Sequence, residues 1–194
     1  MKRVLGLGLL VLGVVGWGPA RPAARAGDQE DARKGTVVEI DDLKSQAPAD
    51  WESVKTTDDM RVYQFRIPPV KGDKRDADLV IFYFGGQGGT PADNVKRWKA
   101  MFDPPRGKTI DDVSKVTKMK VGSVDVTYLD VHGTYKEKFP PFAPNAKVTE
   151  RPDYRMLAVV FESPKGPYFF RLVGPAKTVG EHKKGFDEWL KGFK

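Results

Sequence analysis

The sequence predicts an α+β fold, an antiparallel β-sheet packed between helices in an αβα sandwich. Two observations lead to this prediction: strand patterns outnumber helix patterns, and most neighbouring strands are separated by turn sequences typical of hairpins. The chain has 194 residues, of which 40% are hydrophobic and 30% charged. It is therefore long enough for one domain with a hydrophobic core.

Short strands are predicted in the first half of the chain, at residues 37–40, 61–67 and 79–84. Residues 61–67 alternate in polarity and place Tyr63, Phe65 and Ile67 on one face. Residues 79–84 are continuously apolar, as in a central strand that is covered on both faces.

A helix is predicted from Pro91 onward, because Thr90 can cap it and proline is favoured at the first helical position. Two hairpins follow, formed by residues 113–121 with 124–135 and by residues 154–162 with 168–173. The chain closes with an amphipathic helix, for which Thr178 and Glu181 match a capping box. Its apolar stripe contains Val179, His182, Phe186, Trp189, Leu190 and Phe193.

The N-terminus has the three parts of a secretory signal peptide. Lys2 and Arg3 precede an apolar run of about 14 residues, and Ala24-Arg25-Ala26 ends the segment in an A-x-A pattern. We expect residues 1–26 to be a signal peptide cleaved near Ala26, residues 27–35 a disordered leader, and residues 36–194 a single α+β domain. The apolar run is shorter than the roughly 20 residues of a membrane span, so no transmembrane span is expected in the mature chain.

The formal net charge of +7 does not indicate a nucleic-acid partner. Residues 1–26 hold four of the 33 basic residues and no acidic one, which leaves 29 basic against 26 acidic residues in the mature chain. A net charge of about +3 is too small to suggest binding to nucleic acid. Export without any cysteine is typical of a bacterial periplasm, or of secretion from it.

Little in the sequence points to catalysis. Without cysteine there are no thiolate metal sites or cysteine nucleophiles, and we expect no metal and no cofactor. Asp130 and His132 share one face of a predicted strand, but the serines lie in turns and no G-x-S-x-G motif occurs. His182 is expected at the core boundary. The sequence therefore predicts a protein that is not an enzyme.

A glycine-rich segment, residues 85–89, lies between a predicted strand and a capped helix. Free backbone N–H groups at a helix N-terminus can hold a phosphate or a carboxylate. An anion site formed by Gly86, Gly88, Thr90 and Arg97 is thus one hypothesis, although the spacing does not match G-x-G-x-x-G. The alternative is a flexible connection or a tight reversal.

Residues 136–153 show no regular periodicity and are predicted to form a long loop. Prolines, aromatic residues and cations are interleaved there, a composition that suits a partner-binding surface. The candidate contact residues are Lys136, Lys138, Phe139, Phe142, Lys147 and Arg151. The alternative is that Phe139 and Phe142 fold back and cover a sheet edge.

The order of these segments resembles a group of uncharacterised exported bacterial proteins and, more distantly, the Mog1/PsbP-like fold. The segments that carry the resemblance are residues 48–51, Asn94 to Trp98, Thr127 to Gly133, Tyr168 to Pro175 and Phe186 to Phe193. That superfamily includes a nuclear GTPase-binding protein, an extrinsic photosystem subunit and bacterial envelope proteins. The resemblance implies binding or accessory work, and no family site residue has a matching motif here.

Two functions follow from the sequence. The first is an exported, non-catalytic domain with an accessory or partner-binding role in the bacterial periplasm or envelope, acting through residues 136–153. Its partner would be an envelope protein or component. The second is a small-ligand or anion-binding protein, or a weak hydrolase, that uses residues 85–89.

Overall fold

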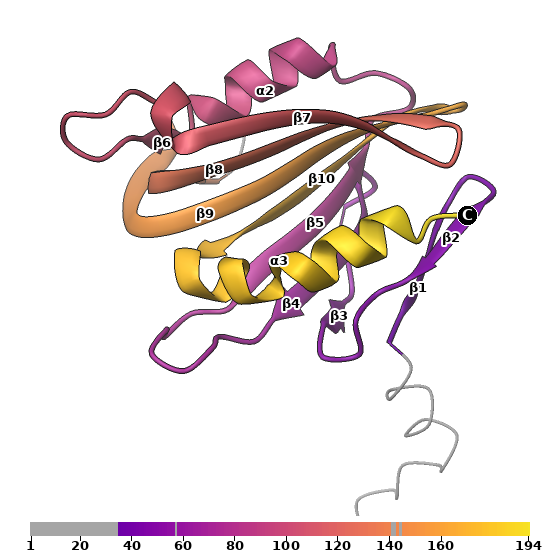
Figure 1. Cartoon of the computed structure of the whole chain (residues 1–194), viewed down its shortest axis with the longest axis horizontal. Helices are drawn as coiled ribbons and strands as arrows, with labels where there is room; N and C mark the ends of the chain where they lie inside the picture. Colours follow the sequence, from indigo (N-terminus) through magenta and orange to yellow (C-terminus); the bar gives the residue numbers. More distant parts are fainter. Residues whose placement is uncertain (1–34, 57, 141–142, 144) are drawn as a thin grey trace, which may run out of the picture.

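The structure is a computed structural model, and it describes residues 35–56, 58–140, 143 and 145–194. Within these residues, eight strands form one sheet in the order β3-β4-β5-β10-β9-β8-β6, with β7 paired to β8, and β1 and β2 form a separate hairpin (Figure 1). The strands are β1 (Val37–Ile40), β2 (Leu43–Gln46), β3 (Glu52–Val54), β4 (Arg61–Ile67), β5 (Ala77–Tyr83), β6 (Phe102–Asp103), β7 (Ser114–Val121), β8 (Val124–Phe139), β9 (Lys147–Ser163) and β10 (Gly166–Pro175). The helices are α2 (Pro91–Lys99), the short 3₁₀ helix η1 (Asp111–Val113) and α3 (Ala176–Lys191).

The strand pairs are antiparallel, which confirms the predicted α+β class and both predicted hairpins. β5 lies between β4 and β10, as expected of a continuously apolar strand. The finer prediction, an αβα sandwich, stays a prediction.

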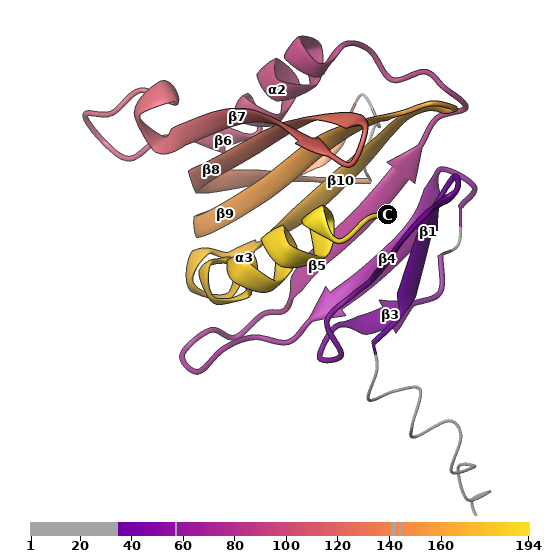
Figure 2. The same ribbon diagram turned by 45° about the vertical axis from the view of Figure 1, so that its right-hand side comes forward.

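Apolar side chains pack on both faces of the sheet because neighbouring residues of a strand point to opposite sides. Leu79 and Ile81 of β5 join a core cluster that includes Phe186 of α3. The alternate β5 residue Val80 belongs to a second cluster with Trp98 of α2. Helix α3 lies across β9 and β10 (Figure 2).

The start of α3 differs from the prediction. Thr178 does not cap the helix with Glu181, because α3 already begins at Ala176. Instead the Thr178 backbone N–H and hydroxyl both donate to a carboxylate oxygen of Asp73, at 2.9 and 2.6 Å. A distant side chain from the β4–β5 connection therefore satisfies a helix-terminal donor. Local sequence spacing cannot reveal a partner more than 100 residues away.

The prediction of a long loop at residues 136–153 is wrong. β8 continues to Phe139 and β9 begins at Lys147, so most of this segment is a β-hairpin. Arg151 forms two hydrogen bonds with Glu137 across the strands, at 2.9 and 2.7 Å. These strand ends are partly exposed on both faces. Polar and proline residues therefore occur on both faces, and the alternation of apolar and polar residues that predicts a strand is missing. The structure does not describe Phe142, and the predicted signal peptide also lies outside the described residues.

Candidate functional site

Apart from Phe142, which is outside the described residues, the partner-binding residues predicted from the sequence lie near the turn between β8 and β9. Lys136 forms a salt bridge with Asp103, with 2.7 Å between the ammonium nitrogen and a carboxylate oxygen, and Arg151 forms one with Glu137. Phe139 is 73% exposed, so it does not fold back over a sheet edge. Lys138 and Lys147 are exposed too.

The residues of the predicted anion site are not brought together around one point. Thr90 and Asp93 form a complete capping box, in which the Asp93 N–H donates to the Thr90 hydroxyl at 3.2 Å. The Asp93 carboxylate therefore already occupies the end of α2 that an anion would need. A Cβ on Gly166 would lie 2.5 Å from the Gly86 Cα, so Gly86 packs against the β9–β10 turn.

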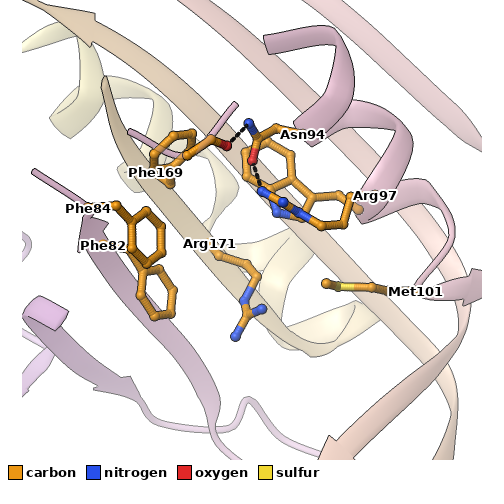
Figure 3. A pocket seen from close by; sticks show the side chains of 9 residues that line it. Phe82, Phe84, Asn94, Arg97, Met101, Phe169 and Arg171 are labelled. Carbon is orange, nitrogen blue, oxygen red and sulfur yellow. Dashed lines mark hydrogen bonds between the residues drawn. The ribbon is translucent and has the colours of Figure 1, made fainter. Parts of the chain in front are cut away.

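Gly88 and Arg97, by contrast, line one pocket between α2 and the sheet. The cavity has a volume of about 310 Å³ and is shown in Figure 3. Its walls come from the end of β5, the glycine-rich loop, α2 and β10. The lining residues are Phe82, Phe84, Gly88, Asn94, Arg97, Trp98, Met101, Phe169 and Arg171.

Aromatic rings form one wall of the pocket. Phe82 and Phe84 are stacked with ring centroids 5.9 Å apart, and Phe84 lies 5.6 Å from Phe169. A Cβ on Gly88 would come within 2.5 Å of the Phe169 ring, and Gly88 has a φ of 123°. Glycine is therefore required where the loop crosses this ring.

Asn94 organises the opposite wall. It is fully buried, and its amide nitrogen donates to the backbone carbonyls of Gly88 and Thr90, both at 2.9 Å. These two bonds fix the amide so that its oxygen accepts a hydrogen bond from Arg97. Asn94 thus ties the glycine-rich loop to α2 and holds Arg97 beside the pocket (Figure 3).

Arg171 brings a positive charge to the sheet side of the pocket. Its guanidinium carbon lies 5.4 Å from the centre of the Phe82 ring, within cation–π distance. The Arg171 Nε is buried, and no residue that the structure describes accepts a hydrogen bond from it. Figure 3 shows the side chain between Phe82 and Met101. The Arg171 side chain thus lines the cavity, while its buried Nε has no acceptor among the described residues.

Sequence reasoning included Gly88 and Arg97 but missed the rest of the pocket. Arg171 carried a signal, because it is the one charged residue in the apolar run from Tyr168 to Val173. A charge on a strand covered on both faces is rare without a partner or a role. Phe82 and Phe169 stand in apolar runs of the sequence, where nothing distinguishes them from other core residues.

The other candidate chemistry is engaged in structural contacts. Asp130 is held by Arg155 through two hydrogen bonds, at 2.8 and 2.6 Å. Ser114 does not join Asp130 and His132 as a nucleophile would have to. It pairs with Val131, whose side chain points to the opposite face of β8 from Asp130 and His132, and the Ser114 side chain lies on that same face as Val131. His182 faces Asp50 at 3.5 Å at the edge of the core. The described residues hold no group of three or more potential metal ligands.

Tyr128 and α3 are joined by a polar cluster at the core boundary. The Tyr128 hydroxyl donates to Asp187 at 2.9 Å, and Lys183 donates to the same hydroxyl at 3.2 Å. Burial, together with the negative charge of Asp187, raises the pKa of Tyr128 far above its usual value. Tyr128 therefore stays neutral and anchors α3.

No helix in the described part of the chain combines the length and the hydropathy of a membrane span.

Comparisons with known proteins find similar solved structures. No family model matches the chain, and no curated protein matches it. The structure is similar to the solution structure of cyanobacterial PsbP (CyanoP) from Synechocystis sp. PCC 6803, with 15% identity, a TM-score of 0.48, and coverage of 91% of this chain and 97% of that chain. It is also similar to a protein of unknown function from Pseudomonas aeruginosa, PA94, described as a candidate regulator, with 15% identity, a TM-score of 0.43, and coverage of 80% of this chain and 93% of that chain. A PsbP protein is thus among the solved structures to which this chain is similar.

Proposed function

We propose that the chain is a non-catalytic binding protein of the bacterial envelope, which takes up a small, largely apolar ligand in the pocket beside α2. The observation that supports this is the cavity of about 310 Å³, in which four aromatic residues and one methionine are combined with a few polar groups at defined positions. Concave, apolar sites of this size with few polar groups are typical of small-molecule binding. Asn94 and the capped α2 preform the site before any ligand arrives.

The envelope location rests on the sequence of residues 1–26. We infer export, cleavage near Ala26, and a single αβα-sandwich domain over residues 36–194. The packing of Trp98 and of α3 in different core clusters supports the sandwich. N-terminal sequencing of the protein from the periplasmic fraction should read from Gly27; a cytoplasmic protein that begins at Met1 would contradict export.

Binding of a neutral aromatic probe tests the pocket. Naphthalene-2-carboxamide should bind the mature chain at one site with a dissociation constant below about 1 mM, measured by isothermal titration calorimetry. Met101→Trp should abolish this binding because the larger side chain fills the cavity.

Met60→Trp is the matched control, since Met60 is 44% exposed and is not part of the pocket. This variant should bind the probe like the wild type. Absence of saturable binding, or equal binding by both variants, would overturn the proposed pocket.

A second candidate function is partner binding through the end of the β8–β9 hairpin. The observation that favours it is the 73% exposure of Phe139, directly opposite Lys147 in the register, so that ring and cation share one face. Exposed aromatic residues beside cations are enriched at interfaces.

Affinity capture from envelope extract at rising salt tests the hairpin. A saturable partner captured by the wild type should be lost with Phe139→Ser and kept with Val62→Ser, which changes an exposed valine on β4. Capture of the same partner by both variants would place the interface elsewhere.

A further inference from the structure

Two guanidinium groups line the pocket, and neither is neutralised by a salt bridge within the described residues. Arg171 has a buried Nε without an acceptor among these residues. Arg97 is held on the opposite wall by the amide oxygen of Asn94, a neutral acceptor. An arginine carries its charge at every physiological pH and offers five N–H donors.

Asp78 is the acidic group whose electrostatic influence on Arg171 has to be weighed. Burial raises the pKa of Asp78, and a hydrogen bond from Gln64 together with the charges of Arg171, Arg61 and Arg66 opposes that rise. The Asp78 carboxylate is directed to Gln64, with 2.9 Å between the amide nitrogen and the carboxylate oxygen. No described contact joins it to Arg171 within salt-bridge distance. Arg171 therefore has Asp78 as an acidic neighbour but forms no salt bridge with it.

We propose that the ligand of this pocket carries a carboxylate, which Arg171 binds with support from Arg97, while its apolar body lies against Phe82, Phe84 and Phe169. This inference rests on the proposed function. A guanidinium in a place of low dielectric matches a planar carboxylate with paired hydrogen bonds. The surrounding rings accept an aromatic or branched apolar body.

A carboxylate fits better than a phosphate group. Phosphate sites commonly use several free backbone N–H groups at a helix N-terminus. At α2 the Asp93 N–H donates to the Thr90 hydroxyl and the Thr90 N–H donates to the Asp93 carboxylate, so these two donors are already engaged. The cationic groups of the pocket are instead the side chains of Arg97 from α2 and Arg171 from β10.

A matched pair of ligands tests this proposal. Naphthalene-2-carboxylate and naphthalene-2-carboxamide have nearly the same shape and differ in charge. Isothermal titration calorimetry at pH 7 should give a dissociation constant about 10- to 100-fold lower for the carboxylate, as expected for a charge-assisted hydrogen bond in a partly buried site.

Substitutions then assign the preference to a residue. Arg171→Met should reduce the preference for the carboxylate to within about twofold while the amide still binds, because the apolar walls remain. Arg171→Lys should keep part of it, since a lysine retains the charge but not the planar donor pair. Arg66→Met removes an exposed arginine that does not line the pocket and should keep all of it.

Each outcome separates this inference from the proposed function. Equal affinity for the carboxylate and the amide would overturn the inference and leave the pocket as an apolar site. A preference that persists in Arg171→Met would overturn the assignment to Arg171. Binding of neither probe would overturn both. If Arg171→Met does not fold by circular dichroism, Arg171→Lys and Arg97→Met carry the test, and each should weaken the preference.

Discussion

Replacing Phe170 with alanine should lower the free energy of unfolding by about 3–5 kcal/mol. Phe170 is fully buried at the centre of β10, where its ring lies 5.8 Å from Phe161, 5.6 Å from Trp189 and 6.0 Å from Phe193. Removing the ring leaves a cavity among rigid aromatic side chains, which cannot collapse around it. The loss should also loosen α3, because Trp189 belongs to this helix.

Urea denaturation followed by tryptophan fluorescence measures this loss. Phe139→Ala is the matched control, since it removes the same atoms from a side chain that is 73% exposed, and it should change stability by no more than about 0.5 kcal/mol. A loss below about 1.5 kcal/mol for Phe170→Ala would show that the aromatic core is not packed as described.

The second large effect is expected for Gly133→Ala, which should destabilise the chain by about 2–4 kcal/mol. Gly133 has a φ of 153°, and a Cβ there would lie 2.5 Å from the Asp103 carbonyl oxygen. The residue sits where the β8–β9 register shifts, next to the pairing of β6 with β8. Backbone strain and a clash with main-chain atoms act together, and neither can be relieved by a side-chain rotation.

Gly107→Ala provides the control because Gly107 also has a positive φ, of 81°, but a Cβ there meets nothing within 4 Å. It should cost only about 1 kcal/mol, the strain alone. Equal losses in the two variants, measured by thermal and urea unfolding, would argue against the close approach of β8 to Asp103. Gly133→Ala should also weaken ligand binding. The backbone N–H of Lys136 in β8 donates to the carbonyl of Met101, which lines the pocket, at 2.8 Å, so a shift of β8 would displace Met101.

Much of the fold could be predicted because its signals are local. The alternation of residues 61–67, the apolar run at 79–84 and the Thr90 cap are each written within a few neighbouring residues, and the structure has β4, β5 and α2 there. The turn at Gly122-Ser123 likewise joins β7 and β8.

The errors came from contacts that are distant in the sequence. Asp73 and Thr178 are 105 residues apart, so the spacing of Thr178 and Glu181 suggested a local cap instead. The ends of β8 and β9 are stabilised by cross-strand pairs such as Glu137 with Arg151, which a search for apolar periodicity does not detect.

The pocket could be predicted only in part for the same reason. Its walls require β5 and β10 to pair in a particular register, with Phe169 opposite Phe82 and Arg171 opposite Val80. Sequence spacing identified Gly88 and Arg97 as candidates because a glycine-rich loop preceded a capped helix. It could not show that the capped end of α2 is occupied and that the cavity opens beside the helix instead.

Nuclear magnetic resonance of the methionine methyl groups tests the central claim, a ligand pocket beside α2, most directly. The chain has five methionines, of which Met101 lines the pocket while Met60 and Met119 lie outside it. Titration of the ¹³C-methyl-labelled protein with naphthalene-2-carboxylate should shift the Met101 signal saturably and leave Met60 and Met119 unchanged. An unshifted Met101 signal at saturating probe, or equal shifts at all three residues, would contradict the pocket.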